Sequence, residues 1–201
     1  MSATIAGPDG KSRCRWSGAA PEFLAYHDTE WGFPVDDDRR LFEKLSLEGF
    51  QSGLSWRTIL AKRENFRAAF HDFDFDRIAR FTERDVAHLL KDEGIVRHRG
   101  KIEAVINNSR QARELVKREG SLAAFIWRYE PKQLAKPQTV STSADAIALS
   151  KDLKKLGWKF VGPTTVYAFM QAMGLINDRV AGCVIRSKVE RARKSFKRPG
   201  C

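Results

Sequence analysis

The stretch that decides the fold is "TERDVAHLLKDEGIVRHRGKIEAVINNSRQARELVKREG", residues 82–120. Its first part predicts a helix that opens with a capping box, Thr82 three residues before Asp85, and closes on Gly94. Its second part predicts a longer helix that begins near Arg99 and ends at Gly120. Apolar residues recur at helical spacing in both parts: Val86, Leu89, Leu90, Ile102, Val105, Ile106, Ala112, Leu115 and Val116. Two helices joined by a very short turn between glycines indicate a helix-hairpin-helix motif.

The turn itself, "GIVRHRGK" at residues 94–101, has the composition of a phosphate-binding site. A helix N-terminus presents free N–H groups and partial positive charge, and Gly100 would let a sugar-phosphate backbone approach closely. The surrounding basic residues are Arg97, His98, Arg99 and Lys101. Such contacts position a duplex without selecting its sequence. A polar loop between two helices would have a similar composition, so this stretch alone leaves both interpretations open.

The rest of the chain favours an all-α protein, because no stretch alternates with the period of a strand. Further helices are predicted in "STSADAIALSKDLKKLG", residues 141–157, and in "GPTTVYAFMQAMG", residues 162–174. The segment "RYEPKQLAKPQTVSTS", residues 128–143, is the one long irregular connection. It either divides two lobes or crosses the surface of one.

Length and composition exclude several classes of protein. The chain has 201 residues and 42% hydrophobic residues, enough for a sizeable core, but no apolar run approaches the ~20 residues that a membrane helix needs. Residues 1–12 have no apolar segment and predict a disordered lead, not a secretion signal. Three cysteines argue against a disulfide framework and against a four-cysteine iron–sulfur cluster. We therefore expect a cytoplasmic protein without a membrane partner.

The formal net charge of +11 suggests an anionic partner such as nucleic acid. Residues 186–201 hold seven Lys and Arg against one Glu and so supply +6 of it. We expect this segment to be a flexible basic tail that follows a domain at residues 13–185. As a hypothesis, the tail adds nonspecific affinity for DNA; a solvated tail without a role is the alternative.

One carboxylate lies where an apolar side chain is expected. In "LSLEGFQSGLSW", residues 45–56, and the helical pattern before it, Glu48 falls on the same side as Leu41 and Leu45. Glu43 and Lys44 are predicted to fall away from that side. A buried unpaired charge is costly, so Glu48 is a candidate functional residue.

Aromatic residues gather in the same part of the chain: Trp16, Tyr26, Trp31 and Trp56. Aromatic faces can sandwich a planar base, and hold a cationic base more strongly. Ordinary core packing explains most such residues and is the alternative here.

Several segments occur together in the order seen in the 3-methyladenine DNA glycosylase I family, which the chain resembles over about residues 13–185. They are "RCRW", "AYHDTEWGFP", "LFEKLSLEGFQSGLSW", "KRENFRAAF", "GIVRHRGKI", "KFVGPTTVYAFMQAMGLIND" and "GC". The resemblance implies an all-α helix-hairpin-helix glycosylase fold with a base pocket between two lobes. It also implies base-excision repair: hydrolysis of the N-glycosidic bond of 3-methyladenine in alkylated double-stranded DNA. The family is monofunctional and has no lyase activity.

By the same resemblance, Glu48 contacts the flipped base, Tyr26 and Trp56 stack on it, and Trp16 lines the pocket. A cationic methylated base would compensate the charge of Glu48, whereas neutral adenine would leave it unpaired. The DNA-binding residues would be Gly94, Arg97, His98, Arg99, Gly100 and Lys101. Leu54, next to Gly53, is a candidate wedge for the gap that a flipped base leaves; packing into the core is the alternative.

The family also carries a structural zinc site, Cys-x12-His followed by His-x3-Cys. Cys14, His27 and Cys183 fit three of its ligands, but the fourth position is Arg179, which cannot bind zinc. Zinc could be absent with Arg179 paired to an acid, zinc could be held by three protein ligands and water, or Cys201 could complete the site. Loss of zinc is the expectation, and the chemistry requires no cofactor.

Two other functions are kept open. A non-catalytic helix-hairpin-helix protein could bind damaged DNA, but it would have no need for Tyr26, Glu48 and Trp56 at family spacing. An enzyme acting on free alkylated nucleosides would have no phosphate backbone for the 94–101 turn to hold. A monomer is the expected state.

Overall fold

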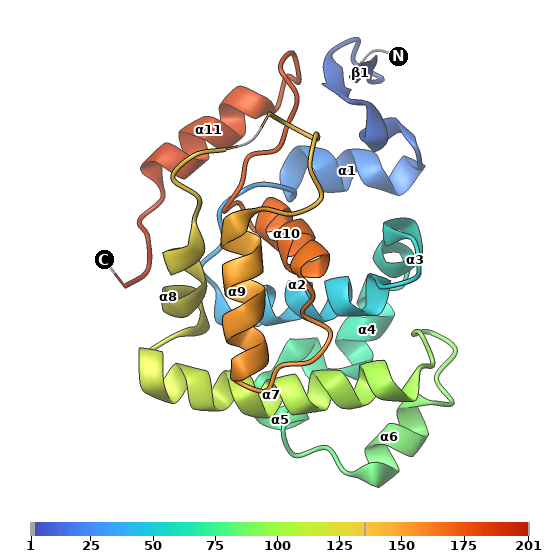
Figure 1. Cartoon of the computed structure of the whole chain (residues 1–201). Helices are drawn as coiled ribbons and strands as arrows, with labels where there is room; N and C mark the ends of the chain where they lie inside the picture. The colour runs from blue at the N-terminus through green and yellow to red at the C-terminus, as the bar shows by residue number, and fades with distance from the viewer. Residues whose placement is uncertain (1–2, 135, 201) are drawn as a thin grey trace.

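The computed structural model describes residues 3–134 and 136–200 and confirms the all-α prediction (Figure 1). The helices are α1 Pro21–Thr29, α2 Asp38–Gln51, α3 Trp56–Ala61, α4 Arg63–Ala69, α5 Phe75–Ile78, α6 Glu83–Leu89, α7 Arg99–Glu119, α8 Leu122–Ile126, α9 Ala144–Lys155, α10 Pro163–Ala172 and α11 Arg186–Ser195. Three short 3-10 turns are η1 Arg15–Gly18, η2 His71–Phe73 and η3 Trp127–Tyr129. A small antiparallel hairpin, β1 Thr4–Ala6 with β2 Ser12–Cys14, precedes them. None of the described helices is long and apolar enough to cross a membrane.

Helix α2 lies at the centre of the molecule and packs against α3, α7, α8 and α10 (Figure 1). Its first turn is fixed by Asp37, whose carboxylate accepts a hydrogen bond from the Arg40 N–H at 2.8 Å. Apolar side chains on several sides of the helix are buried: Leu41, Phe42, Leu45, Leu47 and Phe50. Between Leu41 and Phe50 every residue except Glu43 is buried, so Lys44 and Glu48 in this stretch lie inside the protein.

The predicted helix-hairpin-helix motif is formed by α6, the turn after it, and α7. The capping box of Thr82 and Asp85 is present, but α6 ends at Leu89, five residues before the predicted stop. The chain leaves the helix early because the Asp92 carboxylate accepts a bond from the Gly94 N–H at 2.7 Å, which closes a local turn. Helix α7 begins at Arg99 as predicted and ends at Glu119, where Gly120 caps it with a φ of 86°.

Both ends of the chain are more ordered than predicted. Residues 4–14, expected to be mostly a disordered lead, form the hairpin, and the Val184 N–H donates to the Ser12 carbonyl at 2.8 Å. The segment after residue 185 was expected to be flexible, but residues 186–195 form α11. The prediction counted its charges and overlooked Val189, which is fully buried. Arg193 and Arg198 each lie 2.8 Å from Glu130.

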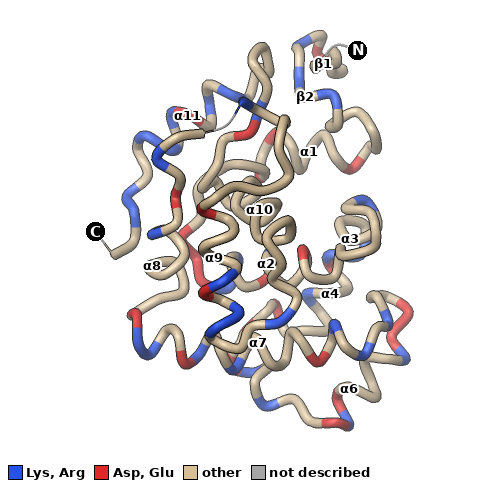
Figure 2. The backbone as a smooth tube through the Cα atoms, viewed as in Figure 1, with Lys and Arg blue, Asp and Glu red and all other residues tan. Residues whose placement is uncertain are grey.

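The position of α11 bears on the tail hypothesis. In Figure 1, α11 and the turn between α6 and α7 lie at opposite sides of the molecule. Figure 2 shows α11 with several blue residues and the α6–α7 turn with blue and red residues close together. The basic tail therefore does not extend the predicted DNA-binding hairpin.

Candidate base-binding pocket

A cavity of about 440 Å³ opens beside α1, α2, α3 and α10. Its wall is formed by Trp16, Phe23, Tyr26, Trp31, Glu48, Gln51, Trp56, Gln138, Val140, Ala168, Gln171 and Asp178. The four residues predicted to bind a base, Trp16, Tyr26, Glu48 and Trp56, are thus brought together from four separate elements. The irregular connection at 128–143 contributes Gln138 and Val140, so it crosses the surface and closes one side of the cavity.

The aromatic rings of the cavity pack edge against face or at a tilt. The ring centroids of Tyr26 and Trp56 lie 5.3 Å apart at 45°, and those of Trp16 and Trp31 lie 5.0 Å apart at 79°. Trp56 is the first residue of α3, where the Ser55 hydroxyl caps the helix. The buried Trp56 indole N–H finds no hydrogen-bond partner within the described residues. The cavity of about 440 Å³ beside these rings leaves room for a planar ligand.

Glu48 is buried, as its position on the apolar face predicted, with 6% of the residue exposed. It is not unpaired, however. Lys44, one turn earlier on α2, places its Nζ 2.8 Å from Glu48 Oε1. The expectation that only a cationic base could compensate Glu48 is therefore wrong, because the protein supplies its own cation.

Lys44 is the charged residue of this cluster that was not predicted from the sequence to be buried. It was predicted to fall away from the apolar face, but α2 is enclosed on most sides and Lys44 is only 5% exposed. Its Nζ donates to Tyr26 Oη at 2.9 Å and lies 3.2 Å from the centroid of the Trp56 ring. Burial lowers the pKa of Lys44, although the nearby Glu48 carboxylate acts in the opposite direction.

A second buried carboxylate, Asp178, also lines the cavity and was not predicted. Its Oδ1 accepts from the Gln138 N–H at 2.9 Å and its Oδ2 accepts from Gln171 Nε2 at 2.6 Å. Burial raises the pKa of Asp178. Asp178 follows α10 in an irregular segment, where no helical or strand periodicity marks a side chain as inward-facing.

Leu54 is exposed at 43%, which excludes the alternative that it packs into the core. It lies in the turn between α2 and α3, directly after Gly53, which has a φ of 78°. An apolar side chain on a tight exposed turn beside a base-sized cavity has the placement that a wedge requires. Its entry into DNA stays a prediction.

The basic residues of the hairpin differ in where they point. Arg97 and Arg99 are about half exposed, and they pair with Glu93 at 3.3 Å and with Glu83 at 2.6 Å. His98 caps α7, since its Nδ1 accepts from the Lys101 N–H at 3.3 Å. The prediction that four cations surround a phosphate here is therefore too broad.

Lys101 in particular faces inward. It is 7% exposed, and its Nζ donates to the Phe50 carbonyl at 2.9 Å and to the Ser52 carbonyl at 2.5 Å. These carbonyls belong to the end of α2 and the turn that leads to Leu54. Lys101 thus ties the hairpin to the candidate wedge instead of presenting a charge to DNA.

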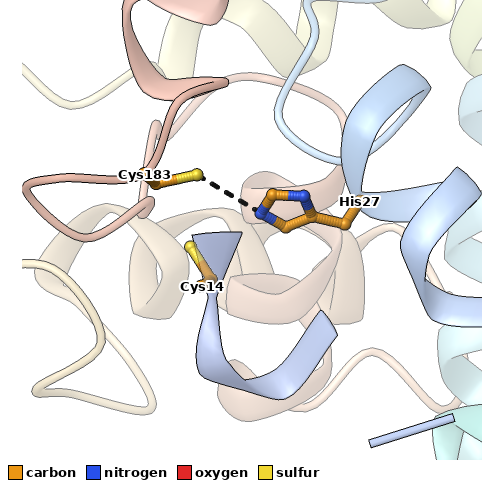
Figure 3. A group of neighbouring side chains, drawn as sticks. All are labelled: Cys14, His27 and Cys183. Carbon is orange, nitrogen blue, oxygen red and sulfur yellow. Dashed lines mark hydrogen bonds between the residues drawn. The ribbon is translucent and has the colours of Figure 1, made fainter. Parts of the chain in front are cut away.

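The predicted metal-binding residues Cys14, His27 and Cys183 form a compact buried cluster, with their ligand atoms within 4.8 Å of one another (Figure 3). His27 Nε2 lies 3.5 Å from Cys183 Sγ. Zinc bonds of about 2.0 and 2.3 Å at a tetrahedral angle would hold N and S about 3.5 Å apart. His27 Nδ1 lies 2.7 Å from the Asp28 carboxylate. This contact with Nδ1 leaves Nε2 as the ring nitrogen that would bind a metal ion. Three donors thus fit zinc.

The fourth position does not fit. Arg179 is fully buried, and its Nη2 donates to the His27 carbonyl, so it does not pair with an acid as one alternative supposed. Its Nε and Nη1 find no partner within residues 3–134 and 136–200. The guanidinium lies over the Trp31 ring, 5.0 Å from the centroid. Cys201, the third alternative, lies outside the described residues.

Charge favours a metal-free cluster. A hydrogen bond from Cys14 lowers the pKa of Cys183, and the same contact raises the pKa of Cys14. Burial lowers the pKa of Arg179, and the Coulombic effect of Cys183 and Cys14 opposes that lowering. Zinc with two thiolates and a neutral imidazole would be neutral by itself and would leave that guanidinium as an uncompensated charge in the interior.

Comparisons with known proteins agree with this geometry. The sequence matches the Methyladenine glycosylase family over residues 16–187. It is 49% identical over 177 residues to the DNA-3-methyladenine glycosylase 1 of Escherichia coli (strain K12), covering 85% of this chain and 95% of that protein. It is 43% identical over 178 residues to the DNA-3-methyladenine glycosylase of Haemophilus influenzae (strain ATCC 51907 / DSM 11121 / KW20 / Rd), covering 86% and 96%.

Solved structures give the same result. A 3-methyladenine DNA glycosylase I from Staphylococcus aureus, whose structure concerns 3-methyladenine recognition, superposes with a TM-score of 0.82 at 37% identity, covering 87% of this chain and 96% of that chain. A crystal structure of 3-methyladenine DNA glycosylase I superposes with a TM-score of 0.80 at 47% identity, covering 86% and 98%. The chain therefore belongs to the methyladenine glycosylase family.

Proposed function

We propose that this protein is a base-excision repair enzyme that hydrolyses the N-glycosidic bond of 3-methyladenine in alkylated double-stranded DNA. The single observation that carries the proposal is the cavity wall, in which Glu48 lies among Tyr26, Trp56 and Trp16 in a chain of this family. Its volume suits one flipped base, and its rings supply stacking surfaces.

The base reaches the cavity by leaving the DNA stack. Flipping costs a few kcal/mol and is easier for a damaged base. Leu54, exposed at the turn after α2, fills the gap in the duplex. Arg97 and Arg99 leave their ion pairs with Glu93 and Glu83 and bind DNA phosphates instead. The N-terminus of α7 faces the DNA backbone.

The chemistry requires little from the protein, because methylation at N3 makes the base a cation and a good leaving group. The C1′–N9 bond breaks with its electron pair going to N9, so the base leaves neutral. Water adds to C1′ of the oxocarbenium-like sugar and gives a proton to solvent. Glu48 and the aromatic rings hold the base in a fixed orientation and exclude water from it.

The enzyme is monofunctional. A lyase step needs an amine that attacks C1′, and no lysine belongs to the described wall of the large cavity. Lys44 does not line that cavity and is bound to Glu48 and Tyr26. A metal held by Cys14, His27 and Cys183 would not touch the base, because these residues do not contribute to the cavity wall. We also propose that the protein acts as a monomer in the cytoplasm.

The test is release of 3-methyladenine from methylated duplex DNA by the wild type, Glu48→Gln and Glu48→Ala. Release that falls at least about tenfold in both variants supports the proposal, since a hydrogen bond to a charged group contributes that much. No release by a folded wild type that still binds the duplex would instead favour a non-catalytic binder of damaged DNA. Accumulation of nicked strands during release would refute the monofunctional assignment.

A further inference from the structure

We propose that Lys44 is a positioning residue of the base pocket: its ammonium fixes the Glu48 carboxylate and the Tyr26 hydroxyl in the orientation in which both meet the flipped base. This inference rests on the proposed function, and it concerns a residue that sequence analysis placed on the outside of α2. It makes Lys44 part of how the pocket recognises adenine, although Lys44 itself does not touch the base.

The ammonium of Lys44 is fully engaged. Its three hydrogens have three neighbours: Glu48 Oε1 at 2.8 Å, Tyr26 Oη at 2.9 Å and the face of the Trp56 ring, whose centroid is 3.2 Å away. The side chains of Lys44 and Glu48 are 7% and 6% exposed, so water does not compete for these contacts. All three neighbours are the residues predicted to hold the base.

Lys44 lies behind the wall of the base cavity, not in it. It lines a second, much smaller cavity of about 20 Å³, whose wall also includes Tyr26 and Trp56. These two aromatic residues line the large cavity as well, so they separate the two spaces. A base can therefore stack from the large cavity without displacing the ammonium.

The direction of the hydrogen bonds determines what the pocket offers a base. Lysine only donates, so Tyr26 Oη accepts and its own hydrogen is free to point into the large cavity. Glu48 Oε1 is held by Lys44, which leaves Oε2 as an acceptor. A donor beside an acceptor matches the N7 acceptor and the N6 amino donor of adenine, whereas guanine presents two acceptors at that edge.

The charged groups on neighbouring elements do not replace Lys44. Glu30 at the end of α1 pairs with Arg63 of α4 at 2.6 Å, and Glu43 pairs with Arg67 at 2.8 Å. The charged residues that line the two cavities or act on this cluster are Glu30, Arg40, Glu43, Arg63, Arg67, Asp178 and Arg179. Since the two flanking acids have their own arginines, Lys44 is the cation that holds Glu48.

This arrangement predicts a pH dependence. Burial lowers the pKa of Lys44, so the ammonium loses its proton at a lower pH than an exposed lysine does. Base release by the wild type should therefore fall on the alkaline side before pH 10.5, the ordinary value for lysine. A variant without an ammonium at position 44 should lack that fall.

The experiment measures release of 3-methyladenine from methylated duplex DNA between pH 6.5 and 10, a range chosen around the ordinary titration of lysine. The variants are Lys44→Met, Lys44→Gln, Lys44→Arg, Glu48→Gln and the double variant Lys44→Met/Glu48→Gln. Lys44→Gln keeps a donor without the charge and serves if Lys44→Met does not fold. Arg67→Met, which breaks the neighbouring ion pair with Glu43, is the matched control.

Lys44→Met and Lys44→Gln should lower release at neutral pH at least about tenfold, as expected for a lost hydrogen bond to a charged group. Lys44→Arg should recover most of the rate, and Arg67→Met should match the wild type. In the Glu48→Gln background, Lys44→Met should change release less than about threefold, because the two residues act as one unit. Equal losses in both backgrounds, or wild-type release from both neutral variants, would overturn the proposal.

Binding of free 3-methyladenine by equilibrium dialysis separates the two proposals. If the wild type releases no base, the proposed activity fails, but weaker binding by Lys44→Met than by the wild type would still support Lys44. Equal binding by both proteins, or no binding by either, would overturn its positioning role.

Discussion

Replacing Arg179 by histidine is expected to turn the cluster of Cys14, His27 and Cys183 into a closed zinc site. The change supplies a fourth donor and removes a buried guanidinium, two of whose nitrogens have no hydrogen-bond partner among the described residues. The 3.5 Å separation of His27 Nε2 and Cys183 Sγ already suits a tetrahedral ion, so little rearrangement is needed. The wild type should contain far less than one zinc per chain, and Arg179→His should contain one.

The gain in stability follows from linkage. Free zinc at 1,000 times the dissociation constant would stabilise the folded variant by about 4 kcal/mol. For a chain of this size that corresponds to a rise in Tm of roughly 8–16 °C. Metal content is measured by mass spectrometry of the purified proteins, and Tm with and without a chelator. Arg179→Met, which removes the charge without adding a ligand, is the control. A full equivalent of zinc in the wild type, or none in Arg179→His, would refute the reasoning.

Four further outcomes are expected. Leu54→Ala should slow release from duplex DNA several-fold and single-stranded DNA much less; equal effects on both substrates would exclude a wedge. Arg97→Ala should reduce the slope of log affinity against log salt by about 1, measured by fluorescence anisotropy with duplex DNA. Deletion of residues 186–201 should lower Tm, because Val189 is buried, and leave the salt slope nearly unchanged. Burial raises the pKa of Asp178 above 3.8, so its contribution to stability is present below pH 3.8 and is lost as pH rises through the raised pKa. The Tm of the wild type minus the Tm of Asp178→Asn should therefore decrease as pH rises through that range.

Sequence periodicity predicted the helices whose ends have local chemical signals. Thr82 with Asp85 and the glycine at position 120 mark helix ends through contacts within a few residues, and the structure places helix ends at both. The burial of Glu48 followed from its spacing to Leu41 and Leu45. These features depend on one helix and its own side chains, which is why they could be predicted.

What depends on two distant segments could not be predicted. Lys44 is buried because Tyr26 of α1 and Trp56 of α3 cover the side of α2 on which it lies. The sequence of α2 alone does not indicate where α1 and α3 pack. Lys101 faces inward because carbonyls at the end of α2, about fifty residues earlier, accept its hydrogens. The charge of Lys101 suggested that it contacts DNA, but its side chain is buried and does not face solvent.

Lys44 and Arg179 are two buried cations that have the same kind of surroundings. Each lies near acidic or sulfur groups that would otherwise need a cation from outside: Lys44 beside Glu48, Arg179 near the Cys14–Cys183 pair. Burial lowers the pKa of both, so each costs desolvation free energy in the folded state. In return, the charge of Glu48 is balanced within the protein before any base is bound. For the base pocket, this means that selection of a methylated base cannot come from an unpaired carboxylate. It must come from the lability of the cationic base and from the hydrogen-bond pattern that Lys44 imposes on Glu48 and Tyr26. A neutral adenine that entered the pocket would then be bound but not cleaved, and should inhibit release as a weak competitor.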